Sequence, residues 1–93
     1  MTHAIITLTV TDPTAMDAYR AQAAVAMNSH GISVVQVSTA PQALDGQPHL
    51  PTVCVIVKFP DTDAAQAWMD DPALAEIHAL RRAAGKVGIT MLA

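Results

Sequence analysis

Residues 52–71, TVCVIVKFPDTDAAQAWMDD, contain the strand that decides the fold. The first eight residues are rich in β-branched and apolar side chains, which is typical of a strand. Alternate side chains of a strand point to opposite faces. One face carries Val53, Val55, Val57 and Phe59. Cys54 and Ile56 lie on the other face, so the second face is partly apolar and also needs a cover.

The composition indicates one small globular domain over residues 1–93. Of these residues, 52% are hydrophobic and 14% are charged, against about 25% charged residues in an average domain. Such a chain is too apolar for disorder, and a domain of this size buries only part of its apolar surface internally. An excess of exposed apolar surface predicts self-association.

Charge and cysteine content exclude several classes of protein. A net charge of −3 argues against a nucleic-acid partner, which selects a basic surface. No apolar run is long enough to span a bilayer, so no membrane partner is expected. The first residues lack the basic and small-residue parts of a secretory signal. The single cysteine, Cys54, has no partner for an internal disulfide, and this predicts a cytoplasmic location.

The hydrophobic pattern predicts four strands and two helices. The strands span 3–10, 32–39, 52–59 and 86–92, and the helices span 13–30 and about 61–84. Asp12 is the expected cap of the first helix, and Asp61 or Thr62 that of the second. Pro72 breaks or bends the second helix. Residues 40–51, with three prolines and a glycine, are predicted to be a loop.

The order β-α-β-β-α-β is that of the ferredoxin-like fold, an α+β architecture with a four-stranded antiparallel sheet and both helices on one face. In this fold the strands at 3–10 and 52–59 lie in the centre. The helix-covered face receives Ala4, Ile6, Leu8, Val10, Val53, Val55, Val57 and Phe59. The uncovered face holds Ile5, Thr7, Thr9, Cys54, Ile56 and Thr90.

The uncovered face predicts a homodimer, because a large exposed apolar patch usually marks an interface. A second copy of the chain, packed sheet to sheet, would cover it. The interface candidates are Ile5, Thr7, Cys54 and Ile56.

Several motifs resemble the DUF1330 family. They are TDPTAMDAYR at 11–20, HG at 30–31, LDG at 44–46, VIVKFPDTDAAQAW at 55–68 and LRRAAG at 80–85. The resemblance covers nearly the whole chain in the right order. It implies a dimeric α+β barrel, in which two ferredoxin-like units join their sheets. The family has no agreed biochemical function, so the resemblance implies a fold and no activity.

The chain departs from the usual pattern of that family at polar and aromatic positions. Gln36 or Val37 stands where the family tends to have Arg, Lys58 where it often has an acidic residue, and Met69 where it often has Tyr. If such positions form a pocket, the pocket of this chain is more apolar. Arg81 keeps its family place near the end of the second helix.

Five residues are candidates for a ligand site: Tyr19, Asp45, His49, Trp68 and Arg81. Tyr19 and Trp68 occupy core-facing helix positions, and a partly buried Arg81 needs an anionic partner. Asp45 and His49 lie in the long loop, which we expect to form the mouth of a pocket between helices and sheet. Apolar walls and Arg81 predict a small organic acid as ligand. Under the alternative, these side chains fill the core, Arg81 pairs with a protein carboxylate, and the loop is a solvated connector.

No metal site or cofactor is predicted. Cys54 lies in an apolar strand, so we expect an inert, buried thiol, and one cysteine cannot hold an iron–sulfur cluster. The four histidines, at 3, 30, 49 and 78, include no pair spaced i, i+4, and we expect them singly at the surface or at helix ends. His30 is placed in the last turn of the first helix, where its charge would suit the helix dipole.

Two classes of function are compatible with these features. The first is a dimeric module that binds a small ligand or plays an accessory role. The alternative is a cofactor-free enzyme, an oxygenase, isomerase or lyase that acts on a small organic acid or aromatic, by analogy with other dimeric α+β barrels. No acid–base pair, nucleophile or metal cluster stands out in the sequence, which favours the first class.

Overall fold

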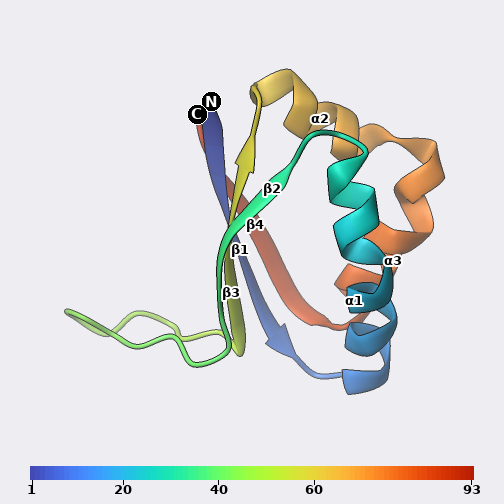
Figure 1. Ribbon diagram of the computed structural model, residues 1–93. Helices are drawn as coiled ribbons and strands as arrows, with labels where there is room; N and C mark the ends of the chain where they lie inside the picture. The colour runs from blue at the N-terminus through green and yellow to red at the C-terminus, as the bar shows by residue number, and fades with distance from the viewer.

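The computed structural model describes residues 1–93 and has two layers, a sheet and a set of helices that all lie on one of its faces (Figure 1). The strands are β1 (Thr2–Val10), β2 (Ser33–Ser38), β3 (Val53–Phe59) and β4 (Gly85–Leu92). The helices are α1 (Pro13–Asn28), α2 (Thr62–Asp70), the 3₁₀ turn η1 (Pro72–Leu74) and α3 (Ala75–Ala83). The two termini lie side by side at one end of the sheet.

The sheet has the predicted ferredoxin-like arrangement. Its strand order is β2-β3-β1-β4, and every neighbouring pair is antiparallel. The strands β1 and β3 are therefore central, and their register places Ile5 opposite Ile56 and Ile6 opposite Val55. The predicted strand and helix bounds agree with the structure to within one or two residues.

Aspartates cap α1, α2 and η1, whereas α3 continues from η1 without a side-chain cap. The carboxylate of Asp12 accepts hydrogen bonds from the backbone amides of Thr14 and Ala15, and that of Asp61 accepts one from Ala64. These bonds satisfy amides that have no partner within the helix. Pro72 ends the ladder of α2 as predicted, and η1 leads the chain into α3.

The end of α1 differs from the prediction. The helix ends at Asn28, and Gly31 takes a left-handed φ of 71°, so His30 lies beyond the last helical turn. Its ring nitrogen Nε2 lies 2.8 Å from Oδ2 of Asp71. This hydrogen bond, with one from the amide of Ala73, holds the pKa of Asp71 below its ordinary value. The pair joins the end of α1 to the break between α2 and η1.

The core lies between the two layers. The buried strand residues are Ala4, Ile6, Leu8, Val53, Val57 and Phe59. The buried apolar residues of the helices and of η1 are Met16, Tyr19, Ala26, Met27, Trp68 and Leu74. These buried residues lie on the strand and helix faces that the sequence pattern predicts to be inward-facing. On the helix-free face of the sheet, Ile5, Thr7, Cys54 and Ile56 are all half-buried.

The connection between β2 and β3 is an arm, residues 40–51, that extends away from both layers (Figure 1). It has no helix or strand, and Leu44 is fully exposed. The adjoining strand β2 forms one edge of the sheet and exposes Val34, Val35 and Val37. Its pairing with β3 shifts register between Val34 and Gln36.

Membrane-spanning helices are not found in the structure: none of its helices combines the length and the apolar character that crossing a bilayer requires.

The junction between α3 and β4 packs tightly against the end of β1. The carbonyl oxygen of Ala84 accepts hydrogen bonds from the amides of Thr11 and Asp12, at 2.8 and 3.0 Å. A Cβ atom on Gly85 would overlap the carbonyl oxygen of Thr9. The backbone at the end of β1 can therefore lie this close to the backbone of residue 85 only because that residue has no side chain.

Gly85→Ala is expected to destabilise the protein by about 1–3 kcal/mol, the usual cost of forcing extra atoms into a packed site. Gly88→Ala in the same strand is the control, because its Cβ would meet only Thr7 Oγ1 at an ordinary 3.7 Å. We expect this second change to stay within about 0.5 kcal/mol. Urea unfolding of both variants measures the difference, and equal stabilities would contradict the close approach.

Candidate functional site

A cavity of about 360 Å³ lies between α1 and the sheet. Eleven of its fourteen lining residues are hydrophobic, and the other three are Arg20, Thr39 and Arg81. Ligand pockets commonly have volumes of roughly 300–1,000 Å³ with mainly apolar walls and a few polar groups. This cavity is at the small end of that range, so it suits a small and largely apolar ligand.

Four elements, together with Arg81 of α3, form the walls of the cavity. The central strands supply Ile6, Leu8, Val53 and Val55, α1 supplies Met16, Tyr19, Ala23 and Met27, and β2 supplies Val34 and Val37. Val34 and Val37 pair with Val57 and Val55 and so share the helix-covered face of the sheet. Arg20, Val34 and Val37 are exposed, which places the opening between α1 and the edge strand β2.

Arg81 is the only buried cation of the cavity wall, and its side chain is 2% exposed. It belongs to the last turn of α3. Its guanidinium lies 5.9 Å from the ring centre of Tyr19 and 5.2 Å from that of Trp68. The single salt bridge of the chain joins His30 to Asp71, so Arg81 has no carboxylate partner. Its Nε atom is buried with no hydrogen-bond partner at all.

His78 contacts Arg81 from the preceding turn of α3. The prediction that the histidines lie at the surface or at helix ends is wrong for this residue. The side chain is 2% exposed. Its Nε2 lies 2.9 Å from the carbonyl oxygen of Trp68, and its Nδ1 lies 2.8 Å from Nη1 of Arg81. Burial lowers the pKa of His78, and the positive charges of Arg81 and Arg82 act in the same direction.

Trp68 forms the layer behind Arg81. Its ring packs edge-on against His78 with centroids 4.8 Å apart, and tilted against Phe59 at 6.2 Å. It lines a second, smaller cavity of about 200 Å³ with Ala4 and Met69, and it is absent from the wall of the first. Its indole Nε1 is buried without a partner. The structure therefore brings Tyr19, Trp68 and Arg81 together, with Tyr19 and Arg81 alone facing the larger cavity.

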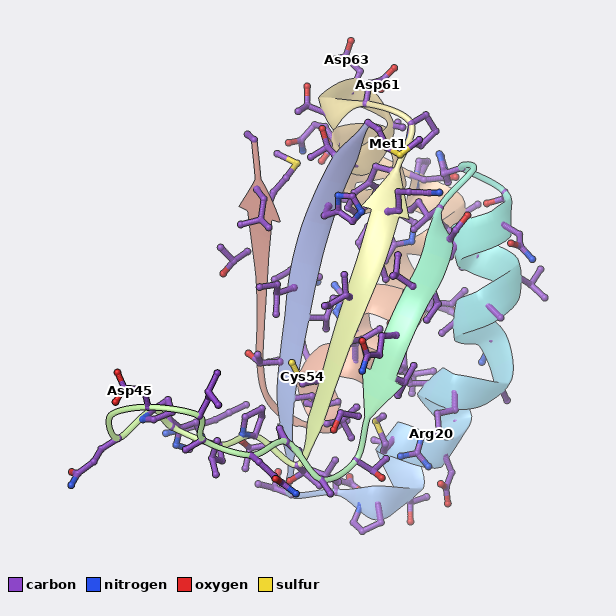
Figure 2. The ribbon with its side chains drawn as sticks, turned by 60° about the vertical axis from the view of Figure 1, so that its left-hand side comes forward. Met1, Arg20, Asp45, Cys54, Asp61 and Asp63 are labelled. Carbon is purple, nitrogen blue, oxygen red and sulfur yellow. The ribbon has the colours of Figure 1, made fainter.

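Asp45 and His49 are not brought to this cavity, and the expectation that the long loop forms its mouth is wrong. Figure 2 shows Asp45 at the far end of the arm, on the opposite side of the molecule from Arg20. His49 Nε2 lies 3.3 Å from Thr9 Oγ1, on the helix-free face. The arm therefore leaves the sheet on the side away from the helices, although it carries the exposed Leu44 and Leu50.

Groups that bind metals do not gather anywhere in the chain: no three His, Cys, Asp or Glu side chains lie close enough to hold an ion. Cys54 is half-buried on the helix-free face. Its predicted burial therefore requires something to cover that face.

His78 is the residue that sequence reasoning missed. Leu74, His78 and Arg81 are spaced i, i+4, i+7, which places them on one face of a helix. Leu74 is apolar and Arg81 is predicted to be partly buried, so the same spacing is a usable signal for His78. A histidine between two inward-facing positions is expected to be buried and hydrogen-bonded.

The family model described as "Domain of unknown function (DUF1330)" matches residues 1–93, the whole chain. None of the curated proteins matches it. Twelve solved chains match it. One is a protein of unknown function from Rhodopseudomonas palustris, with a TM-score of 0.78 and 20% identity; the match covers 98% of this chain and 79% of that one.

Two further solved structures widen the comparison. A dimeric ferredoxin-like protein of unknown function from Jannaschia sp. CCS1 has a TM-score of 0.71 and 13% identity, with 99% of this chain and 97% of that chain covered. SnoaB, a cofactor-independent oxygenase from Streptomyces nogalater, has a TM-score of 0.68 and 15% identity, with 99% and 90% covered. At such identities the similarity establishes a shared fold and carries no activity with it.

The buried neutral state of His78 predicts a pH dependence of stability. Because the pKa of His78 is lowered from 6.5 in the folded chain, the unfolded chain binds a proton first as the pH falls. The contribution of this residue is complete above pH 6.5 and is lost as the pH falls towards the lowered value. His78→Gln does not titrate, so the stability of the wild type relative to this variant should fall below pH 6.5. Urea unfolding from pH 7.5 to 5 measures it; a constant difference would contradict the buried neutral ring.

Proposed function

We propose that this chain, which belongs to the DUF1330 family, is a homodimeric module that binds a small organic acid in the cavity between α1 and the sheet. The observation that carries the proposal is a buried Arg81 with no carboxylate partner. A guanidinium keeps its charge in proteins. Its removal from water therefore has a large cost unless an anion compensates it.

The competing explanation requires a protein carboxylate beside Arg81, and the chain offers none. The neighbours of the guanidinium are a histidine nitrogen, a methionine sulfur and two aromatic faces. The nitrogen and the sulfur can accept hydrogen bonds and the rings attract a cation weakly, but none of these groups carries a negative charge. A ligand carboxylate would supply the missing charge and could form the paired hydrogen bonds that Arg makes with carboxylates.

The walls of the cavity support a ligand with an apolar body. Ile6, Leu8 and Val55 form its floor, and Tyr19 adds an aromatic surface beside Arg81. A short aliphatic chain or one aromatic ring would exchange water for these contacts. Arg20 at the opening is exposed, so its charge is screened by solvent and would act mainly on the approach of an anion.

Binding without turnover is favoured over the enzyme alternative. The similarity to a cofactor-independent oxygenase supports a cofactor-free reaction only by analogy of fold. General acid–base or nucleophilic catalysis needs a suitable group within reach of the substrate. The cavity wall contains no histidine, carboxylate or thiol, and no base in the wall could activate its hydroxyl groups, those of Tyr19 and Thr39. His78 contacts Arg81 from outside the wall. Recovery of unchanged ligand after prolonged incubation with the protein would support the binding role.

A homodimer through the helix-free face completes the proposal. The candidates Ile5, Thr7, Cys54 and Ile56 lie together on the central strands β1 and β3, and Figure 2 looks onto this face. The arm with the exposed Leu44 projects from the same side. The solved ferredoxin-like protein described as dimeric has the same fold. A reducing, cytoplasmic location would suit the single free thiol of Cys54.

Ile56→Asp is expected to convert the dimer to a monomer, because a charge in the middle of the joined sheets would be buried without a partner. Val25→Asp is the matched control, since Val25 is exposed on the helical layer. Light scattering at micromolar concentration gives the mass of the wild type and of both variants. A wild-type protein that is a stable monomer would refute the proposed assembly.

Arg81→Met should abolish selective binding of acids. Four probes test it: benzoate and hexanoate, each with its neutral primary amide. We expect the wild type to bind the acids more tightly, and the variant to lose about tenfold or more in affinity for the acids and little for the amides. Arg82→Met is the control, because Arg82 is exposed and outside the cavity wall. Calorimetry measures each affinity; equal loss of acids and amides would show that Arg81 does not read the carboxylate.

A further inference from the structure

The guanidinium of Arg81 is held by neutral groups only. Nη1 donates to Nδ1 of His78 across 2.8 Å, and Nη2 makes a weak contact with the sulfur of Met69 at 3.9 Å. The rings of Tyr19 and Trp68 lie within 6 Å of its central carbon. These contacts fix the position of the guanidinium and leave its positive charge uncompensated.

The hydrogen bonds of His78 determine which of its nitrogens carries the proton. The carbonyl oxygen of Trp68 can only accept, so Nε2, at 2.9 Å, must be the donor. In a neutral ring Nδ1 then has a free lone pair, and it faces Nη1 of Arg81. A protonated ring would turn a second donor towards the guanidinium. Only the neutral Nε2–H form therefore serves both of its partners.

A guanidinium has two edges that can each grip a carboxylate with two parallel hydrogen bonds. The end-on edge uses Nη1 and Nη2, and the side-on edge uses Nε and Nη2. In this chain one of the two N–H groups of Nη1 is engaged by His78. Nε is buried and has no partner, and Nη2 has only the sulfur contact. The side-on edge thus keeps both of its nitrogens free of strong acceptors, whereas the end-on edge shares Nη1 with His78.

We propose that His78 is a positioning residue, which holds Arg81 by Nη1 so that Nε and Nη2 remain for the carboxylate of a small, apolar monoanion. This inference rests on the proposed function, and it adds the edge of Arg81 that reads the acid and the side chain that selects this edge. A second acidic group on the ligand would find no buried cation, since Arg81 is the only one in the wall. Monocarboxylates are therefore the expected class.

The test compares His78→Leu with His78→Gln, using benzoate and benzamide as probes. Leucine removes the acceptor, so the affinity for benzoate should fall about tenfold or more while that for benzamide stays within about threefold. Glutamine has a carbonyl oxygen that can accept from Arg81 and an amide that can donate to Trp68. It should restore most of the preference for benzoate. A role confined to filling space would give no such rescue, because neither replacement carries the ring.

A spectroscopic measurement on the wild type keeps the test decisive if His78→Leu does not fold. The nitrogen chemical shifts of the His78 ring at pH 7 should show a proton on Nε2 and none on Nδ1. A proton on Nδ1 would overturn the proposal, as would an unchanged ratio of benzoate to benzamide affinity in a folded His78→Leu. If His78→Leu keeps the ratio of benzoate to benzamide affinity but Arg81→Met loses it, the proposed function stands and only the role of His78 is overturned. A wild type that binds neither acid would overturn both.

Discussion

The pairing of β1 with β3 is the constraint on which the rest of the structure depends. Its register puts Ala4 opposite Val57 and Ile6 opposite Val55, so alternate residues of both central strands enter one core. A slip of β1 by one residue against β3 would turn Ala4 and Ile6 to the helix-free face and bring Thr7 under the helices. The helical layer would then lose its apolar support, and the larger cavity would lose its floor.

The chemistry of the cavity follows from what this layer surrounds. Arg81 comes from the last turn of α3, where a cation also suits the negative end of the helix dipole. Packing against Tyr19, Trp68 and His78 removes it from water without neutralising it. Electrostatic attraction is stronger in such surroundings than at the surface. A single positive charge can therefore give an almost wholly apolar pocket a clear preference for acids.

The sequence was sufficient for the fold because strand alternation, aspartate caps and a helix-breaking proline are local signals. The family match over residues 1–93 and the strand order confirm that prediction. Only part of the candidate site could be predicted from the sequence. Helical spacing marked Tyr19, Trp68 and Arg81 as inward-facing, and they do lie together. The direction of the arm that carries Asp45 and His49 was not predictable. Prolines indicate a loop, but they do not determine on which side of the sheet the loop extends. The partners of His78 depend on the bend at Pro72, which sets α3 against Trp68 only in three dimensions.

The edge strand β2 has a consequence for the behaviour of the protein in crowded solution. The segment from Ser33 to Ser38 contains three exposed valines and no charged side chain. Such an edge exposes unpaired backbone groups that can recruit another strand and start fibril growth. Many proteins block this with a lysine or a proline. Here the irregular register between Val34 and Gln36 breaks the regular spacing that an incoming strand would need. We expect this irregularity to hinder edge-to-edge pairing without a charged side chain on β2 itself.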